Sequence, residues 1–181
     1  MTAFLAKPFY RSKVCYLLSE LSEDREGTEP VRPGWKADYR DKRVLLAEDN
    51  EINREIAREL VGESGVVIEE ACDGAEAVRM VRESEEGYYD LILMDIQMPE
   101  MDGYEATREI RALERRDVKR LPIVAMTANA FAEDVQAACR AGMNAHLAKP
   151  IDLNELERIL KQYLSEGNAM EERPGKGVGT V

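Results

Sequence analysis

The middle of the chain alternates between two hydrophobic patterns. Short continuous apolar runs, such as LILM in YYDLILMDIQ, are typical of strands buried on both faces. Between them lie longer segments with apolar residues three and four positions apart, the spacing of amphipathic helices. The strand-like runs fall within residues 43–50, 66–74, 88–95, 121–127 and 145–150, and the helical segments within residues 51–65, 75–84, 104–115, 132–142 and 151–164.

These strand–helix pairs in strict alternation predict an α/β fold. The expected architecture is a doubly wound five-stranded parallel sheet, covered by helices on both faces. Each crossover between parallel strands should be right-handed. In such sheets the working site lies at the carboxyl ends of the strands. The polar residues that close the apolar runs are therefore the candidate site residues.

Polar side chains close four of the five runs. Glu48 and Asp49 follow the first run, Asp95 ends the third, and Thr127 and Lys149 follow in the fourth and fifth. Three clustered carboxylates repel one another and need a cation, and oxygen ligands without His or Cys select a hard ion such as Mg²⁺ or Mn²⁺. Lys149 adds a positive charge that can pair with a carboxylate or a phosphoryl oxygen. Thr127 offers a hydroxyl donor.

This group of side chains suits phosphoryl chemistry. A carboxylate held between a metal ion and a lysine can attack phosphorus as a nucleophile and become an acyl phosphate. The site then contributes mainly positioning and charge neutralisation. Any one acid at a strand end could instead be an ordinary solvated turn residue. Five such residues, placed by four separate apolar runs, favour a site over that interpretation.

Composition and charge narrow the class of partner. Of the 181 residues, 44% are hydrophobic, and 36 acidic against 25 basic residues give a formal net charge of −11. This balance argues against a nucleic-acid partner, which needs a basic surface. Cys15, Cys72 and Cys139 are odd in number and far apart, which favours a reducing cytoplasm over disulfides or a zinc site. No apolar run reaches the roughly 20 residues of a membrane span, so we expect no direct membrane contact here, although a longer parent protein could be membrane-anchored.

Four motifs in sequence order carry a resemblance to a known family. LLAEDN, LILMDIQMPEMDG, AMTANA and HLAKP resemble the receiver domain of two-component response regulators, across about residues 42–164. The resemblance implies a flavodoxin-like strand order of 2-1-3-4-5 and a phosphoacceptor at Asp95. It implies Mg²⁺, with Mn²⁺ as a substitute, held by Asp95 together with the metal ligands Glu48, Asp49 and the backbone carbonyl of Gln97.

The resemblance also implies roles for the remaining strand-end residues. Thr127 would bond one phosphoryl oxygen after phosphorylation, and Lys149 would pair with another. The Lys149–Pro150 peptide would be cis, which an X-Pro bond tolerates at small cost. Together with Asp95, these residues would make a signalling domain that catalyses its own phosphorylation and dephosphorylation.

Three further positions are expected to modulate the site. Gln97 and Asn129 lie two residues beyond Asp95 and Thr127, where receivers face the water that hydrolyses the acyl phosphate. Neither amide is a strong base, so we expect phosphoryl lifetimes well beyond seconds; the alternative is that both are loop caps. His146 stands where receivers often place an aromatic switch residue, and an edge-strand histidine with no such role is the alternative.

The phosphoryl donor is expected to be another domain. His146 is the only histidine and lies in a predicted strand, and no Gly-rich phosphate loop is present, so the sequence contains no histidine kinase catalytic domain. A phosphohistidine of a histidine kinase is the expected donor, with a histidine phosphotransfer domain as a further partner. A small phosphodonor such as acetyl phosphate could also serve. The resemblance extends to hybrid sensor histidine kinases with tandem receivers.

The amino-terminal segment repeats a phrase from the carboxyl-terminal part of the domain. FLAKPF near the start matches HLAKPI at four of six positions, and an amphipathic segment follows each. A chance overlap before an unrelated helix is the alternative. If the helix is real, its apolar face should dock on this domain or on a second chain. We therefore expect a remnant of a preceding receiver-like domain as an N-terminal helical extension (1–21), a linker (22–42), the receiver domain (43–164) and a flexible tail (165–181).

Two functions from other classes compete with the phosphorelay interpretation. A Mg²⁺-dependent phosphatase with an aspartyl nucleophile, like the haloacid dehalogenase group, would place a second Asp two residues after the nucleophile. That position is Gln97 here, which argues against it. An interaction module that is never phosphorylated is the other alternative, and the presence of all five site residues argues against it.

Overall fold

The central element of the fold is a five-stranded parallel sheet. The computed structural model describes residues 39–128 and 132–165, and its sheet has the order β2-β1-β3-β4-β5. This confirms the predicted doubly wound α/β fold and its strand order. Each pairing is parallel, and β1 and β3 are direct neighbours. The strands are β1 (Arg43–Ala47), β2 (Val67–Ala71), β3 (Leu91–Asp95), β4 (Ile123–Thr127) and β5 (Ala145–Ala148).

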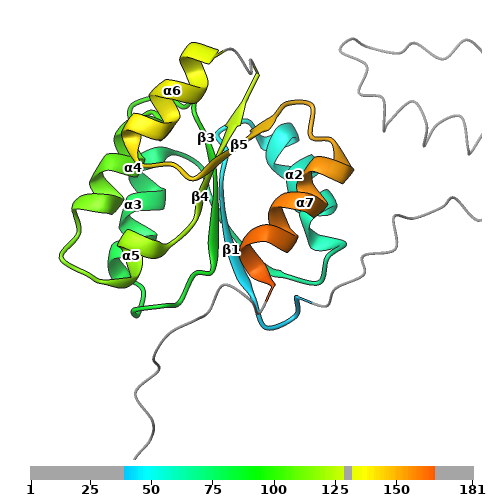
Figure 1. Cartoon of the computed structure of the whole chain (residues 1–181), viewed down its shortest axis with the longest axis horizontal. Coiled ribbons are helices and arrows are strands. Elements are labelled where there is room, and N and C mark those ends of the chain that lie inside the picture. The colour runs from blue at the N-terminus through cyan, green and yellow to red at the C-terminus, as the bar shows by residue number, and fades with distance from the viewer. Residues whose placement is uncertain (1–38, 129–131, 166–181) are drawn as a thin grey trace, which may run out of the picture. The chain divides into compact units, whose positions relative to one another are not determined.

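Helices cover both faces of the sheet, as Figure 1 shows. Two apolar cores result, one under each helical layer, because every residue of β3 and β4 is buried and successive side chains alternate between the faces. One layer holds α2 (Glu51–Gly62) and α7 (Leu153–Leu164), and the other holds α3 (Gly74–Glu83), α4 (Gly103–Ala112), α5 (Asp117–Arg120) and α6 (Ala132–Ala141). The short α5 is the one helix of this set that the periodicity did not predict.

Side-chain caps fix four of the turns that lead from strand ends into helices. Asn50, Asp73, Asp102 and Asp152 each precede a helix and accept hydrogen bonds from backbone amides of its first turn. Such caps satisfy amide groups that have no partner within the helix. They also start each helix at a defined residue just after the strand-end loops. The carboxyl edge of the sheet is therefore held by well-anchored turns.

Two arginines tie the loops at other points of the structure. Arg111 donates to the carbonyl oxygen of Gly142 at 3.0 Å and to Asn144 at 2.9 Å, and so joins α4 to the turn before β5. Burial lowers the pKa of Arg111. Arg115 donates to the carbonyl oxygen of Val81 at 2.6 Å and to Asp117, and so joins the segment after α4 to the end of α3. These contacts hold the helical layer of α3, α4 and α6 together.

Several sequence-based expectations concern residues outside the described ranges. The N-terminal helical extension at 1–21, residues 22–38 of the expected linker and the tail beyond residue 165 belong to this group. Tyr39 is described, and its side chain is only 4% exposed within the core on the α2 and α7 side. The Lys149–Pro150 peptide is cis, as the resemblance implied.

Gly103 generates a prediction about the loop beneath the site. A Cβ atom at Gly103 would lie 2.2 Å from the carbonyl oxygen of Asp95, a contact that requires the backbone to move. We expect Gly103→Ala to lower the free energy of unfolding by about 2–3 kcal/mol, because overpacking forces backbone shifts. Urea denaturation measures this change.

Gly62 provides the matched control for that substitution. It is the last residue of α2, and the nearest atom to an added Cβ is Ile68 Cδ1 at 3.8 Å. Gly62→Ala should raise the free energy of unfolding by about 0.5–1 kcal/mol, because alanine loses less backbone entropy in a helix. Equal stability of the two variants would contradict the close packing of Gly103 under Asp95.

Candidate functional site

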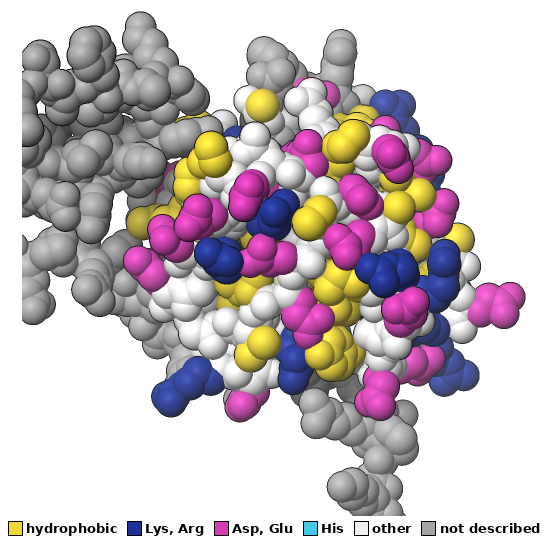
Figure 2. All heavy atoms as spheres, turned by 180° about the vertical axis from the view of Figure 1, so that it is seen from behind, with side chains coloured by type: hydrophobic (Ala, Val, Ile, Leu, Met, Phe, Trp, Pro, Cys, Tyr) yellow, Lys and Arg dark blue, Asp and Glu magenta, His cyan; other side chains and the backbone are white. Residues whose placement is uncertain are grey.

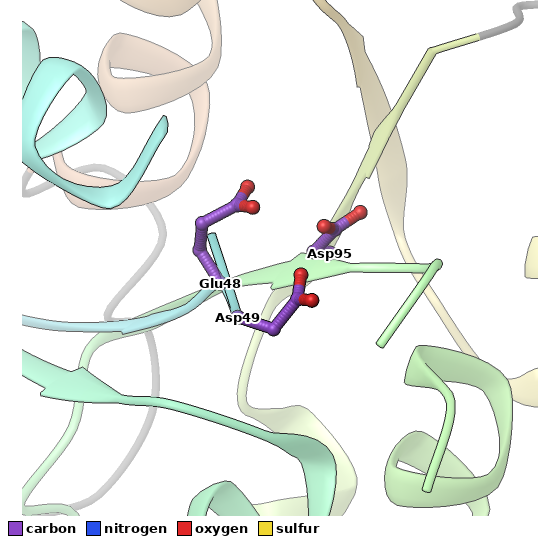
Figure 3. Close-up of side chains that lie close together, drawn as sticks. All are labelled: Glu48, Asp49 and Asp95. Atoms are coloured by element: carbon purple, nitrogen blue, oxygen red, sulfur yellow. The ribbon is translucent and has the colours of Figure 1, made fainter. Parts of the chain in front are cut away.

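Three acidic side chains meet at the carboxyl edge of the sheet. Glu48 and Asp49 directly follow β1, and Asp95 is the last residue of β3. Each offers a carboxylate oxygen, and these oxygens all lie within 4.8 Å of one another. Figure 3 shows the three side chains on neighbouring strand ends with their carboxylates pointing to the same side. The order of the parallel strands brings together residues that are nearly fifty positions apart.

Lys149 reaches the same place from the segment after β5. Its Nζ atom lies 2.6 Å from Glu48 Oε2 and 2.8 Å from Asp95 Oδ2. The backbone amide of Lys149 donates to the carbonyl oxygen of Thr127 at 2.7 Å. Thr127 itself is the last residue of β4 and is buried. The structure thus gathers all five predicted strand-end residues at one edge of the sheet.

Burial sets the charge state of these groups. Glu48 is 1% exposed and Asp95 is 4% exposed, whereas Asp49 is open to solvent. Burial raises the pKa of Asp95 to about 6, Glu48 adds repulsion in the same direction, and the hydrogen bond from Lys149 opposes both. Burial disfavours the charged form of Lys149, but its hydrogen bonds to Asp95 and Glu48 outweigh this, so its pKa is raised. Lys149 is therefore a cation that the two carboxylates share.

Neighbouring donors orient the acidic side chains. Glu48 Oε1 accepts from the backbone amide of Asn50 and from Asn53 Nδ2, each at 3.3 Å. Asp95 Oδ1 accepts from the backbone amide of Gln97 at 3.2 Å. Asn53 and Arg54 were not among the predicted site residues. The signal that could have found them is the cap at Asn50, because a helix that starts there turns its residues at 53 and 54 back toward the acidic pair.

The donor set fits a hard divalent cation. The clustered groups are carboxylates, two of them buried, and within the described residues no His or Cys joins the cluster. Oxygen ligands of this kind suit Mg²⁺, which binds through a few carboxylates and retains some of its waters. The three acids also carry more negative charge than Lys149 neutralises. The residues present therefore fit a magnesium site.

The remaining predicted positions have mixed outcomes. Gln97 has an exposed side chain, and its carbonyl as a metal ligand remains a prediction. Asn129 lies outside the described residues. His146 is partly exposed on β5 opposite Ala125 and lines a cavity of about 140 Å³ together with Cys139 of α6.

None of the described helices is long and apolar enough to span a bilayer.

The raised pKa of Asp95 generates a prediction about stability and pH. The folded state holds the Asp95 proton more tightly than the unfolded chain does, so the free energy of unfolding falls as the pH rises from 3.8 to about 6 and levels off above that. Without divalent ions, Asp95→Asn should be more stable than the unsubstituted chain at about pH 8, by at most about 3 kcal/mol. The difference should shrink as the pH falls through about 6 and disappear below the unfolded pKa of 3.8, where Asp95 is protonated in both states. Urea denaturation in chelator across this pH range measures it.

Excess Mg²⁺ provides the control for this comparison. A cation that binds only the folded state stabilises it, and the unsubstituted chain keeps the third carboxylate. The advantage of Asp95→Asn should therefore shrink when Mg²⁺ is added. A variant that is less stable at high pH, or a difference that does not change with pH, would contradict the charge balance described above.

Comparison with known proteins identifies relatives of the chain. The family model described as response regulator receiver domain matches residues 44–161. Hybrid signal transduction histidine kinase L of Dictyostelium discoideum is 38% identical over 127 residues, which cover 70% of this chain and 7% of that protein. Probable histidine kinase 2 of rice (Oryza sativa subsp. indica) is 46% identical over 120 residues, 60% of this chain and 12% of that protein. The chain thus spans only a small part of the curated relatives that it matches.

Solved structures show the same fold. The receiver domain of a sensor histidine kinase from Pseudomonas aeruginosa, with a magnesium ion coordinated in its active site cleft, is 41% identical with a TM-score of 0.62; the match covers 69% of this chain and 98% of that one. The receiver domain of a yeast (Saccharomyces cerevisiae) response regulator, crystallised with a histidine phosphotransfer protein, is 30% identical with a TM-score of 0.60, over 68% of this chain and 88% of that one. With the parallel sheet of order 2-1-3-4-5 and the acidic cluster at its carboxyl edge, these matches establish that the chain belongs to the response regulator receiver domain family.

Proposed function

We propose that this chain accepts a phosphoryl group from a phosphohistidine onto Asp95 in a two-component phosphorelay. The observation that supports this most directly is the position of Lys149, whose ammonium lies 2.8 Å from Asp95 Oδ2 and 2.6 Å from Glu48 Oε2. It keeps one positive charge beside a buried carboxylate, in the place where the incoming phosphoryl oxygens would need it. Asp95 itself lies on the central strand β3 between the acidic pair and Lys149.

In the proposed transfer, Asp95 acts as the nucleophile. A carboxylate oxygen of Asp95 forms a bond to phosphorus while the bond between phosphorus and the histidine nitrogen breaks, and the electron pair of that bond leaves with the imidazole. The product is an acyl phosphate on Asp95. Lys149 would pair with one phosphoryl oxygen, and the hydroxyl of Thr127 would donate to another. The part played by this chain is positioning and charge neutralisation.

The metal ion would be held by the acidic side of the site. Glu48, Asp49, Asp95 and the backbone carbonyl of Gln97 are the proposed ligands, and Mn²⁺ could replace Mg²⁺ because both accept oxygen ligands. When bound, the cation supplies charge neutralisation for the carboxylates and the phosphoryl oxygens. The hydrogen bonds that orient Glu48 leave its carboxylate in a fixed position at the edge of the cluster. The magnesium in the Pseudomonas aeruginosa receiver supports this assignment.

Partners are proposed from the relatives and from charge. The histidine kinase relatives support a kinase phosphohistidine as donor, and the yeast complex supports a histidine phosphotransfer domain as partner. A cytoplasmic location and a parent protein of the hybrid kinase type fit the same relatives. Nucleic acid is not expected to bind, and on the face shown in Figure 2 acidic and basic side chains are interspersed without a broad basic patch. Gln97, Asn129 and His146 are proposed to tune the lifetime and readout of the acyl phosphate.

Treatment with acetyl phosphate and Mg²⁺ tests the proposed function. We expect the intact chain to gain the mass of one phosphoryl group, and we expect chelator to prevent the gain. Asp95→Asn should show no gain, because an amide cannot attack phosphorus in this way. Intact-protein mass spectrometry measures the result.

Asp90→Asn is the matched control for the acceptor. Asp90 lies just before β3, at the opposite end of the strand from Asp95, where it pairs with Lys42 and accepts from the amide of Arg43. This variant should be phosphorylated as the unsubstituted chain is. Continuous turnover of small phosphate esters would favour the phosphatase alternative, and no mass gain in any variant would favour the interaction module.

A further inference from the structure

Arg54 makes an unusual set of contacts behind the acidic pair. It lies in the first turn of α2, and its side chain is only 15% exposed. Its Nη1 atom donates to the carbonyl oxygen of Glu48 at 2.7 Å and, less closely, to that of Asp49 at 3.4 Å. Its Nε atom lies 3.2 Å from a carboxylate oxygen of Glu70 on β2. One guanidinium thus joins the backbone of both acids to the neighbouring strand.

The backbone of the acidic pair needs such support because it lies at the end of the sheet. The amide of Glu48 still bonds the carbonyl oxygen of Ala71, at 3.1 Å, but the paired residues of β1 end at Ala47. Beyond that point the chain turns toward the cap of α2. The direction in which the carboxylates of Glu48 and Asp49 point depends on how this turn is held. A planar guanidinium can bond the turn and Glu70 at the same time through different nitrogens.

Arg58 lies close to Arg54 but contacts carboxylate side chains and not the backbone of the acidic pair, so it serves as a comparison. It stands one helical turn after Arg54 and also pairs with Glu70, at 3.3 Å. Its other ion pair is with Glu55 at 3.9 Å, and its side chain is 51% exposed. Arg54 and Arg58 therefore share the carboxylate of Glu70, whereas the hydrogen bonds to the backbone of the acidic pair come from Arg54. The two arginines form a natural matched pair.

We propose that Arg54 is a positioning residue for the divalent cation of this receiver domain. It would act through the backbone of Glu48 and Asp49, holding the turn so that their carboxylates converge with Asp95, and would not touch the cation. The inference rests on the proposed function, because it assumes that these acids bind Mg²⁺. It assigns a role in metal affinity to a residue outside the cluster of ligands.

The sign of the effect separates positioning from simple electrostatics. A guanidinium near a cation site repels the cation, so removing a charge alone would strengthen Mg²⁺ binding, and salt would screen the change. Removing a positioning contact has the opposite effect, because residues that hold metal ligands commonly change affinity by about 10-fold or more when substituted. Loss of affinity in an Arg54 variant therefore supports positioning, and a gain supports charge alone.

The test measures Mg²⁺ affinity by isothermal titration calorimetry on the full chain, without any phosphodonor. Arg54→Met, which keeps the length and loses the donors, should weaken Mg²⁺ binding by about 10-fold. Arg58→Met should leave the affinity within about 2-fold, because Arg58 is half exposed and contacts Glu55 and Glu70 rather than the backbone of the acidic pair. Arg54→Lys keeps the charge but cannot bond the turn and Glu70 together, so it should also weaken binding, and it carries the test if Arg54→Met does not fold.

A second readout separates affinity from the transfer step. Phosphorylation of Arg54→Met by acetyl phosphate should be slow at low Mg²⁺ and should approach the rate of the unsubstituted chain at saturating Mg²⁺, because Asp95 and Lys149 are unchanged. Unchanged or tighter Mg²⁺ binding by Arg54→Met would overturn the inference. Equal weakening by Arg58→Met would also overturn it. If the unsubstituted chain binds Mg²⁺ and is phosphorylated, the proposed function stands whichever result the Arg54 variants give.

Discussion

The contact on which the site depends is the one between Lys149 and the two buried carboxylates of Glu48 and Asp95. Moving a charged group from water into the protein interior is costly, and a buried charge is tolerated only when it is paired and hydrogen-bonded. One ammonium satisfies both acids at 2.6 and 2.8 Å, but three carboxylates against one lysine leave two negative charges in excess. That excess equals the charge of one divalent cation. Burial raises the pKa of Asp95 to about 6, and repulsion from Glu48 acts in the same direction.

The parallel sheet makes this concentration of charge possible. Parallel strands that are joined by helices present all their carboxyl ends at one edge, so residues from four strand ends meet although the strands are far apart in the sequence. The buried β3 and β4 give the edge a rigid base, and the capped helix starts limit how far the loops can move. Close packing of Gly103 against the carbonyl oxygen of Asp95 adds a further restraint on the loop after β3. A site with strong internal repulsion is thus built on buried strands and closely packed turns.

Much of this arrangement could be predicted from the sequence, for a physical reason. Continuous apolar runs report strands buried on both faces, and the residue that ends each run must lie at the carboxyl edge, which placed Glu48, Asp95, Thr127 and Lys149 correctly. The strand order came from the resemblance, since periodicity alone does not determine which strands are neighbours. The short α5 escaped prediction because four residues are too few to show a helical period.

Contacts between polar side chains and backbone carbonyls were beyond the reach of pattern analysis. Arg54, Arg111 and Arg115 look like ordinary solvated arginines in the sequence, since each stands on a helix or loop among other charged residues. Each of them donates to backbone carbonyl oxygens, which every residue carries, so no residue type marks these partners. The hydroxyl groups of Tyr88 and Tyr89 donate to Glu69, both at 2.7 Å, and join distant segments. No sequence pattern predicts these contacts either.

Under the proposed function, phosphorylation would disturb the charge balance at its most sensitive point. A phosphoryl group on Asp95 replaces one shared carboxylate oxygen by several charged oxygens, so Lys149 would have to divide its hydrogen bonds anew. Lys149 follows directly after β5, and its backbone amide donates to the carbonyl oxygen of Thr127, the last residue of β4, at 2.7 Å. A shift of Lys149 would therefore move the ends of β4 and β5 together. His146 lies on β5, beside the cavity that borders α6, so this edge of the sheet would change with phosphorylation under the proposed function.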